Sequence, residues 1–374
     1  MTPRRVLLLA ATMVAVCVAG LSGLPGLSAL SGLSARAGRE SLPARLDDQA
    51  FWKLSAELSE PNGSFRSDNL LSNEQGFQLV LPKLLGLAKP DRVYLGVGPE
   101  QNFTYIAALH PKMAFIVDVR RGNLDLHLMY KALFELSADR AEFVSRLFSK
   151  KRPDGLTAKS TVTDIFTAYW NVELKSDEAL YNANLKAMLD LLAVAHGFAL
   201  SEEDRQGITY VYNRFFWFGP GIQYNSSNGS GGGFRGGGQP SYADLMVATD
   251  GAGRMRGYLA SEESFAFLKA LEAKNLIVPV VGNFAGPKAI RAVGAYLKEK
   301  GATVSAFYLS NVEQYLRQDG IWQDFCANVA TLPLDETSSF IRAYRGGFGG
   351  GVGLSSDTEI MATAVKACTA PGQR

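Results

Sequence analysis

The sequence predicts an α/β protein whose centre is a doubly wound, mostly parallel sheet with a helical insertion. Two short, uncharged and largely apolar runs, 93–96 and 113–117, are separated by a segment of helical length. Unbroken strands of this kind occur in parallel sheets that helices cover on both faces. The glycine turn Gly96-Val97-Gly98 closes the first run, and alternating strand and helix patterns return after residue 260. Together these observations indicate a Rossmann-like sheet.

In the first half of the chain, the elements follow from spacing and capping signals. Ser72 and Gln75 are spaced as a capping box, so we expect a helix to open there and to be kinked by Pro82. Apolar residues at helical spacing predict one long helix over 123–149. The other elements expected in this half are helices at 50–58 and 101–109 and strands at 93–96 and 113–117.

Residues 150–240 depart from this alternation, and we expect them to form an insertion that caps one edge of the sheet. The clearest helical pattern in this stretch covers 179–195. Residues 209–218 are dense in aromatic and β-branched side chains, a composition typical of a strand. Nine of the twenty residues in 219–238 are glycine, which predicts a mobile loop.

The second half restores the strand and helix rhythm. The elements expected there are helices at 261–273 and 288–300, strands at 276–281 and 303–309, and a helix and a strand within 323–345. The domain boundaries that follow are a lead-in at 38–69, one α/β domain at 70–345 and a glycine-rich C-terminal segment at 346–374.

Candidate ligand-binding residues gather at the carboxyl ends of the predicted strands, the edge where open α/β sheets bind ligands. Gly96 and Gly98 would let a ligand approach the backbone closely. Asp118, 20 residues beyond Gly98, would accept hydrogen bonds from ribose hydroxyls. Glu100 and Asn283 also follow strands at this edge. The pattern predicts a site for a small-molecule or nucleoside-type ligand.

Each of these residues also has an interpretation without a ligand. Gly96 and Gly98 would form only a tight turn between strand and helix, and Asp118 would cap the helix that follows it. Glu100 would complement a helix N-terminus, and Asn283 would be a turn residue. The sequence shows no serine–histidine–aspartate or cysteine–histidine set, so the catalytic residues stay unassigned.

Composition excludes several classes of partner. Removing residues 1–37 takes away three arginines and no acids, which leaves 35 basic residues against 36 acidic ones. A balance near zero does not favour binding to nucleic acid or to an anionic membrane surface. The three histidines and three cysteines form no cluster with metal-ligand spacing, so no metal is expected.

The N-terminus has the pattern of a secretory signal peptide. Arg4 and Arg5 precede an apolar run at 6–19, and Ala35-Arg36-Ala37 fits a cleavage site. We therefore expect residues 1–37 to be removed from an exported, periplasmic or extracellular protein. An uncleaved membrane anchor over residues 6–30 is the alternative. The paired arginines also leave the twin-arginine export route open.

Two cysteines, Cys326 and Cys368, remain after such a cleavage. An even pair in an oxidising compartment predicts a disulfide. The other interpretation is two small buried thiols.

Two resemblances arise from these residues. The succession from Gly96-Val97-Gly98 through Asp118 to Gly282-Asn283 and Ser310-Asn311 resembles the class I S-adenosylmethionine-dependent methyltransferase fold, over roughly 70–345 with 150–240 as an extra segment. Shorter motifs resemble an exported bacterial family of unknown function: Ser59-Glu60-Pro61-Asn62-Gly63, Ser67-Asp68-Asn69-Leu70-Leu71-Ser72-Asn73-Glu74 and Gly98-Pro99-Glu100-Gln101-Asn102.

The methyltransferase resemblance implies S-adenosylmethionine as cofactor and methyl transfer as reaction. It implies that Gly96 and Gly98 lie against the methionine portion, Asp118 at the ribose and Asn283 beside the transferred methyl group. Where these enzymes usually carry an acid two residues before the first glycine, this chain has Tyr94. Glu100 would then be left to recognise the amino group of the cofactor. The alternative is a non-catalytic binding or scaffolding protein that retains the fold.

Overall fold

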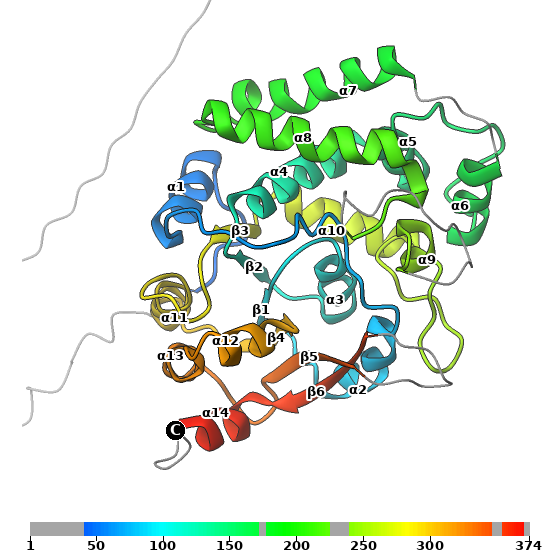
Figure 1. Ribbon diagram of the computed structural model, residues 1–374. Coiled ribbons are helices and arrows are strands. Elements are labelled where there is room, and N and C mark those ends of the chain that lie inside the picture. Colours follow the sequence, from blue (N-terminus) through cyan, green and yellow to red (C-terminus); the bar gives the residue numbers. More distant parts are fainter. Residues whose placement is uncertain (1–40, 172–176, 225–238, 346–353, 370–374) are drawn as a thin grey trace, which may run out of the picture. The chain divides into compact units, whose positions relative to one another are not determined.

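The computed structural model describes residues 41–171, 177–224, 239–345 and 354–369. These residues are built around a six-stranded sheet in the order β3-β2-β1-β4-β5-β6 (Figure 1). Its strands are β1 (Val93–Gly96), β2 (Met113–Asp118), β3 (Ile277–Val281), β4 (Val304–Ser310), β5 (Ser339–Arg345) and β6 (Leu354–Ile360). The first five strands are parallel and β6 runs antiparallel to β5. The predicted fold class, an α/β protein with a doubly wound and mostly parallel sheet, is confirmed.

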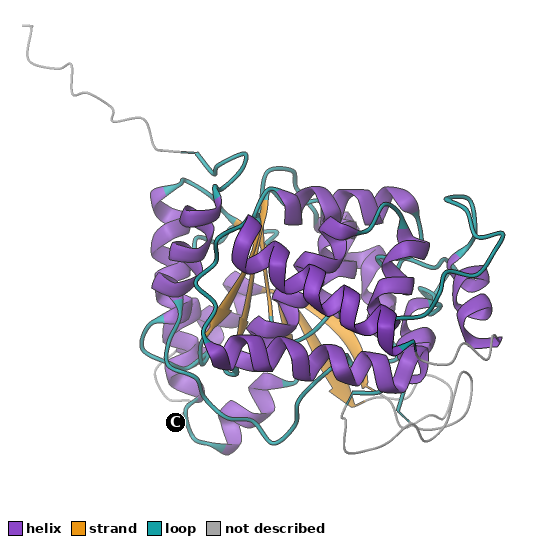
Figure 2. Ribbon diagram, turned by 90° about the horizontal axis from the view of Figure 1, so that it is seen from above, coloured by secondary structure: helices purple, strands orange, loops and turns teal. Residues whose placement is uncertain are grey.

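Helices cover both faces of this sheet (Figure 2). In Figure 1, α3 (Gln101–Leu109), α4 (Arg121–Leu136) and α10 (Glu262–Ala273) lie on one side, and α11 (Ala289–Glu299) and α13 (Trp322–Val329) lie on the other. Every residue of β1, β2 and β3 is buried, which is why these strands show no alternation of polar and apolar residues. The strand order reverses between β1 and β4, so the ligand edge of the fold lies at their carboxyl ends.

The remaining helical elements surround this core. They are α1 (Asp48–Leu58), η1 (Phe77–Val80), α2 (Leu81–Leu87), α5 (Arg140–Phe148), α6 (Val162–Asn171), α7 (Glu178–Asp190), η2 (Leu191–Ala195), α8 (Glu202–Phe218), η3 (Gly219–Gly221), α9 (Tyr242–Met246), α12 (Val312–Gln318) and α14 (Met361–Thr369).

The strand predicted over 209–218 is wrong, because these residues form the C-terminal part of helix α8. Ser201 and Asp204 make a complete capping box at its start. The buried side chains of the helix recur three, four and one residues apart, which is the spacing of one helical face: Asp204, Ile208, Val211, Tyr212, Phe215 and Phe216. Strand propensity mainly reflects how a side chain packs, and here the packing surface is another helix.

Helix α8 lies on α4 and α5 rather than at an edge of the sheet (Figure 1). The predicted insertion therefore adds an outer layer over α4 on one face of the sheet, instead of capping one of its edges. Helices α8 and α4 approach closely at Gly207 of α8, where a Cβ atom would lie only 2.1 Å from Oδ2 of Asp125 in α4. Glycine is required at this crossing because Asp125 fills the space that any side chain would need.

Asp125 makes this helix contact sensitive to pH. Burial, and then the carboxylate of Asp204, raise the pKa of Asp125 from 3.8 to about 8, while Arg121 opposes the shift. In the unfolded chain Asp125 ionises near its ordinary pKa, so the folded state retains a proton that the unfolded state has lost between pH 4 and 8. This contribution to stability is fully present below the unfolded pKa and is lost as pH rises toward the folded one.

We expect Asp125→Asn to be more stable than the wild type at pH 7, by on the order of 1–3 kcal/mol, and equal to it near pH 4. Urea unfolding across this pH range measures the difference. Asp91→Asn is the matched control, because Asp91 is exposed. A stability difference between Asp125→Asn and the wild type that stayed constant with pH would contradict the prediction.

Two further elements differ from the sequence prediction. The helix predicted over 123–149 is two helices, because Asp139 accepts a hydrogen bond from the backbone N–H of Glu142 (2.8 Å) and starts α5 anew. Ser72 and Gln75 do not form a capping box. The hydroxyl of Ser72 donates to Gln101 instead, and the first helical turn, η1, begins after Gly76 without a side-chain cap. Pro82 lies in the first turn of α2, where its missing N–H costs nothing.

The sheet also continues beyond residue 345, where a glycine-rich segment was expected. Strand β6 pairs with β5 from Ser339–Ile360 to Arg345–Leu354. Helix α14 follows and packs on α13. A disulfide joins Cys326 of α13 to Cys368 of α14, with the two Cα atoms 6.0 Å apart. The predicted pairing of these cysteines is therefore confirmed.

Loss of this disulfide is expected to lower the free energy of unfolding by about 2–4 kcal/mol, because the bond closes a loop with a sequence separation of 42 residues. Denaturant unfolding of the native and reduced protein measures the effect. The double variant Cys326→Ala/Cys368→Ala serves as the reference and should match the reduced wild type. Both thiols reacting with a labelling reagent in unreduced, denatured protein would contradict the bond itself.

Several sequence predictions fall outside the described residues. They are the signal peptide at 1–37, the alternative anchor at 6–30, and residues 225–238 of the loop predicted at 219–238. Among the residues that the structure does describe, no helix is both long enough and apolar enough to cross a membrane.

Candidate functional site

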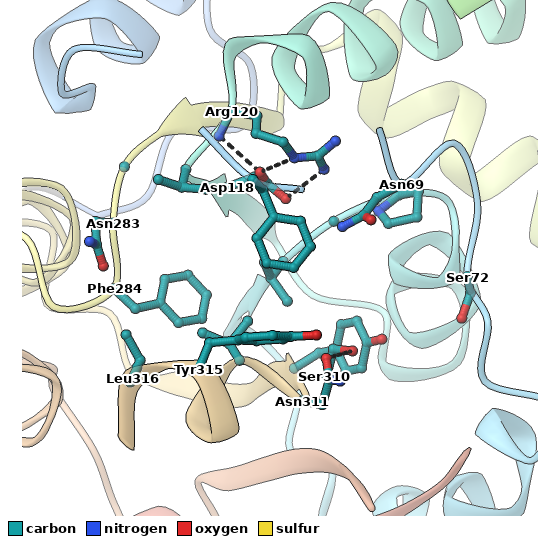
Figure 3. Close-up of a pocket in the computed structure, with 18 of the residues that line it drawn as sticks. Asn69, Ser72, Asp118, Arg120, Asn283, Phe284, Ser310, Asn311, Tyr315 and Leu316 are labelled. Carbon is teal, nitrogen blue, oxygen red and sulfur yellow. Dashed lines mark hydrogen bonds and ion pairs between the residues drawn. The ribbon is translucent and has the colours of Figure 1, made fainter. Parts of the chain in front are cut away.

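A cavity of about 190 Å³ lies at the carboxyl ends of β1 to β4, on the edge that the strand order predicts for a ligand. Figure 3 shows Asp118 and Arg120 on one side of it, Tyr315 and Asn311 on the opposite side, and Asn283 towards one end. The structure brings three of the five predicted site residues into its wall, namely Gly98, Asp118 and Asn283. Gly96 and Glu100 do not line the cavity.

Gly96 serves the packing of the turn. A Cβ atom at this position would lie 1.8 Å from Oδ1 of Asn102. The amide nitrogen of Asn102 donates to three backbone carbonyls of the turn, those of Val97 (2.9 Å), Gly98 (3.2 Å) and Pro99 (2.7 Å). Asn102 therefore holds the loop after β1 in shape, and Gly96 leaves the space that Asn102 occupies.

Tyr94 completes the same arrangement. Its hydroxyl donates to Oδ1 of Asn102 (2.9 Å), and burial raises the pKa of Tyr94 well above its ordinary value, so the proton needed for this bond is retained. Tyr94, at the position where methyltransferases usually carry an acid, therefore stabilises the turn through Asn102.

Gly98, in contrast, faces the cavity. Its φ of +72° lies in the left-handed region that glycine adopts without strain, and no atom lies within 4 Å of the place where a Cβ would be. Behind it, Nε2 of His127 lies 2.9 Å from the carbonyl oxygen of Gly98. Burial lowers the pKa of His127 to about 4, so the imidazole is neutral at physiological pH. The backbone of Gly98 is thereby fixed from one side and open on the other.

Asp118 stands at the end of β2 and is already engaged by Arg120. Nε of Arg120 donates to Oδ1 (3.0 Å), a terminal nitrogen of the guanidinium donates to Oδ2 (3.1 Å), and the backbone N–H of Arg120 donates to Oδ1 (2.9 Å). The other terminal nitrogen of Arg120 donates to the carbonyls of Ser67 and Asp68. Asp118 is 4% exposed and Arg120 is 9% exposed. The pair leaves Oδ2 of Asp118 with spare capacity to accept a ligand hydroxyl.

Asn283 follows β3 and lies beside a carboxylate from the lead-in. Its side-chain oxygen accepts from the backbone N–H of Ala285 (2.9 Å), which fixes the side chain in a turn. Its own backbone N–H donates to Oε2 of Glu60 (3.1 Å). Asn283 is therefore both a turn residue and part of the cavity wall, and the two interpretations from the sequence coexist.

Glu100 is buried and does not line the cavity. It is 1% exposed, and Oε1 accepts a hydrogen bond from the backbone N–H of Ser72 (3.3 Å). Burial raises its pKa to about 8, against the effect of this hydrogen bond. A carboxyl group that is mostly protonated at neutral pH and faces the interior cannot recognise a ligand amino group in the cavity.

The sequence prediction missed the wall that the lead-in supplies. Residues between Ser64 and Asn73, from the end of the lead-in and just beyond it, line one side of the cavity. Phe65 packs edge-on against Tyr315 of α12, with ring centroids 5.1 Å apart, and Arg66 donates to the hydroxyl of Tyr315 (2.7 Å). Tyr224 and Phe284 add further rings to the lining. The aromatic residues of the lead-in and α12 carried no motif from which this contact could be predicted.

A fully buried carboxylate, Glu74, stands behind the cavity. Oε1 accepts from the hydroxyls of Tyr308 (2.6 Å) and Ser310 (2.7 Å), both of which line the cavity. Oε2 accepts from Ser356 (2.9 Å) and from the amide of Gln101 (3.0 Å). Glu74 is 0% exposed. It thus joins the segment before η1 to α3, β4 and β6, and it keeps the polar side chains at the carboxyl end of β4 in place.

The chemistry that this lining supports is binding and orientation. Its ionisable side chains, tyrosines aside, are the Asp118–Arg120 pair and the exposed Asp319. Both oxygens of Asp118 already accept hydrogen bonds from Arg120, so the pair offers a ligand polar contacts rather than an unengaged carboxylate. Among the described residues, no group of three or more histidine, cysteine, aspartate or glutamate side chains is placed to hold a metal ion.

Comparison with known proteins places the chain in a family. A family model described as "Domain of unknown function (DUF7790)" matches residues 70–206 and 239–365. The matched segments contain all six strands and the cavity residues Gly98, Asp118 and Asn283. No curated protein matches the chain. Because the model matches more than half of the sequence, the chain belongs to the family described as Domain of unknown function (DUF7790).

Proposed function

We propose that this protein binds a nucleoside-like small molecule in the cavity at the carboxyl edge of its sheet, with S-adenosylmethionine as the candidate cofactor of a methyl transfer. The observation that carries the proposal is the convergence of Gly98, Asp118 and Asn283 on one cavity between β1 and β3. In an α/β sheet of this strand order, a glycine after the first strand and an acid after the second are the positions that contact a nucleoside.

The residues present fit such a ligand in three respects. The backbone at Gly98 is open where any other residue would place a Cβ atom. Oδ2 of Asp118 accepts only from Arg120 among the described residues and has capacity for a ribose hydroxyl. The rings of Phe65, Tyr224 and Phe284 line the cavity and offer apolar surface to a base.

The charge of the lining also suits a sulfonium ligand. Asp118 and Arg120 neutralise one another, and Asp319 adds one negative charge. When bound, S-adenosylmethionine would supply an electrophilic methyl group. The part of this chain is then to bind the ligands, orient them and exclude water, because proximity and orientation account for much of the rate enhancement of such a transfer.

Isothermal titration of the folded, full-length protein with S-adenosylmethionine and S-adenosylhomocysteine tests the proposal. We expect binding by the wild type and a loss of about tenfold or more in affinity for Asp118→Asn, since the amide accepts fewer hydrogen bonds. The control Asp91→Asn changes the same group on the surface and should bind like the wild type. An absence of heat and of thermal stabilisation at millimolar ligand would remove the methyltransferase proposal.

A non-catalytic binding or scaffolding protein is the second candidate. The observation that favours it is the Asp118–Arg120 pair, in which both oxygens of the best-placed carboxylate of the cavity already accept hydrogen bonds from Arg120. Product formation distinguishes the two candidates. Binding of S-adenosylhomocysteine without methyl transfer to small nucleophiles would favour the binding protein.

We further propose that the protein is exported to the periplasm or the cell exterior. The basic start and apolar run before residue 38 support export, and the Cys326–Cys368 disulfide is compatible with an oxidising compartment. Sequencing the N-terminus of the mature protein tests this, with a start near Gly38 as the expected result. An unprocessed chain in the cytosol would contradict it and would place the protein where S-adenosylmethionine is made.

A further inference from the structure

The helices that open onto the ligand edge would ordinarily attract a phosphate. In doubly wound sheets, phosphate groups of nucleotides bind at helix N-termini, where backbone N–H groups are free and the helix dipole is positive. Here α3, α4 and α11 begin at this edge, directly after β1, β2 and β3 or a short turn beyond them. The state of their first N–H groups therefore decides whether the site accepts a phosphate.

At α11, a carboxylate of the chain itself occupies this position. Oε1 of Glu60 accepts from the backbone N–H groups of Lys288 (2.9 Å) and Ala289 (2.7 Å), and Oε2 accepts from that of Asn283 (3.1 Å). A Cβ atom on Gly286 would lie 2.4 Å from Oε2 of Glu60. Three backbone donors and a glycine thus enclose one carboxylate, which is the arrangement that protein sites offer to a small anion.

The start of α4 is occupied in a similar way. The first N–H of α4, that of Arg121, donates to Oδ1 of Asn62 (2.8 Å). At α3, no side chain caps the first N–H groups, and Pro99, two residues before the helix, has no N–H to offer a ligand.

The guanidinium in the lining is also engaged. Arg120 directs its nitrogens to Asp118 and to the carbonyls of Ser67 and Asp68. Transferring this guanidinium to a ligand phosphate would leave Asp118 buried without its partner, which is costly.

We propose that the lead-in residues Glu60 and Asn62 act as built-in occupants of the anion positions at the N-termini of α11 and α4, so that the cavity prefers a neutral or cationic nucleoside to its phosphorylated counterpart. The ligand part of this inference rests on the proposed function. It deepens that proposal by naming the ligand class. Nucleosides and sulfonium nucleosides are expected to bind, whereas nucleotides and dinucleotides are expected to bind more weakly or not at all.

The first experiment compares adenosine with adenosine 5′-monophosphate on the full-length wild type, by titration calorimetry and thermal shift. We expect adenosine to bind and the monophosphate to bind about tenfold more weakly or not at all. A monophosphate that binds as well as adenosine, or better, would overturn the inference while leaving the proposed site intact. If neither of them binds, and S-adenosylmethionine does not bind either, the proposed function fails. The second experiment then tests, without a nucleoside, whether Glu60 occupies an anion position.

The second experiment uses inorganic phosphate as the probe. Glu60→Ala frees three backbone donors, so we expect phosphate to raise the melting temperature of this variant but not that of the wild type. Glu57→Ala is the matched control, since it removes an exposed carboxylate three residues away on α1. If Glu60→Ala does not fold, Glu60→Gln replaces it, with a smaller phosphate response expected because the amide oxygen still caps the helix. A folded variant that responds to phosphate no more than the control would refute the role of Glu60.

Discussion

Replacing Gly96 with alanine is expected to lower the free energy of unfolding by about 4–6 kcal/mol, which for a domain of this kind is a large part of the total. The new Cβ atom would lie 1.8 Å from Oδ1 of Asn102 and 2.9 Å from Cε1 of Tyr94. Both neighbours are fully buried, so neither can move into solvent. Asn102 must leave its place, and three turn carbonyls and the hydroxyl of Tyr94 then lose their hydrogen-bonding partner.

Denaturant unfolding followed by circular dichroism measures this loss. Gly86→Ala is the control, because Gly86 lies within α2 and a Cβ there would meet no atom within 4 Å. Alanine at that position is expected to leave stability unchanged or to raise it by up to about 1 kcal/mol. Near-wild-type stability of Gly96→Ala would show that Asn102 does not fill this space, and would return Gly96 to the list of ligand-contacting residues.

Replacing Glu74 with alanine is the second large effect, with an expected loss of about 4–5 kcal/mol in the free energy of unfolding. Two hydroxyls of β4, the hydroxyl of Ser356 and the amide of Gln101 donate to this carboxylate. Burial, and the charge of Glu74 after it, raise the pKa of Tyr308 well above its ordinary value, so its hydroxyl remains a donor. Removing Glu74 takes the shared acceptor from four donors and leaves a cavity the size of the lost side chain. Tyr308 and Gln101 each keep a second hydrogen-bond partner, whereas the hydroxyl of Ser356 loses its acceptor.

The variant Glu74→Gln keeps the shape of the side chain and removes its charge, so it separates these two contributions to stability. The amide keeps one acceptor oxygen, so we expect a loss of about half that of alanine, together with local rearrangement at Tyr308 and Ser310. The control Glu299→Ala removes an exposed carboxylate from α11 and should change stability by less than about 0.5 kcal/mol. A Glu74→Ala protein as stable as this control would refute the network. Because Tyr308 and Ser310 line the cavity, the same variants should also weaken any ligand that binds there.

The elements that the sequence predicted correctly are those whose signal is local. The strands predicted at 93–96 and 113–117 and the helix predicted at 101–109 follow from short uncharged runs and from helical spacing, and these patterns need only neighbouring residues. The strand predicted at 209–218 failed for the opposite reason. Its composition suits a sheet, but its place on α4 and the capping box at Ser201 made it a helix.

The same division runs through the candidate site. Gly98, Asp118 and Asn283 line one cavity because strand ends in a parallel sheet share one edge, and this convergence could be predicted from three separate local patterns. The functions of Gly96 and Glu100 were not found, because they depend on what lies across the fold, an asparagine side chain in one case and a buried interior in the other.

By itself, the sequence predicted the parallel strands of the sheet and the edge at which their carboxyl ends meet, and it left Cys326 and Cys368 as the two cysteines available for a bridge. Only the tertiary structure decided that Arg120 holds Asp118, that Glu60 caps α11 and that the lead-in lines the cavity. The physical reason is distance along the chain. The periodicity of buried side chains can be recognised from neighbouring residues. A contact such as that between Glu60 and Ala289 joins residues 229 positions apart, and no pattern of neighbouring residues predicts it.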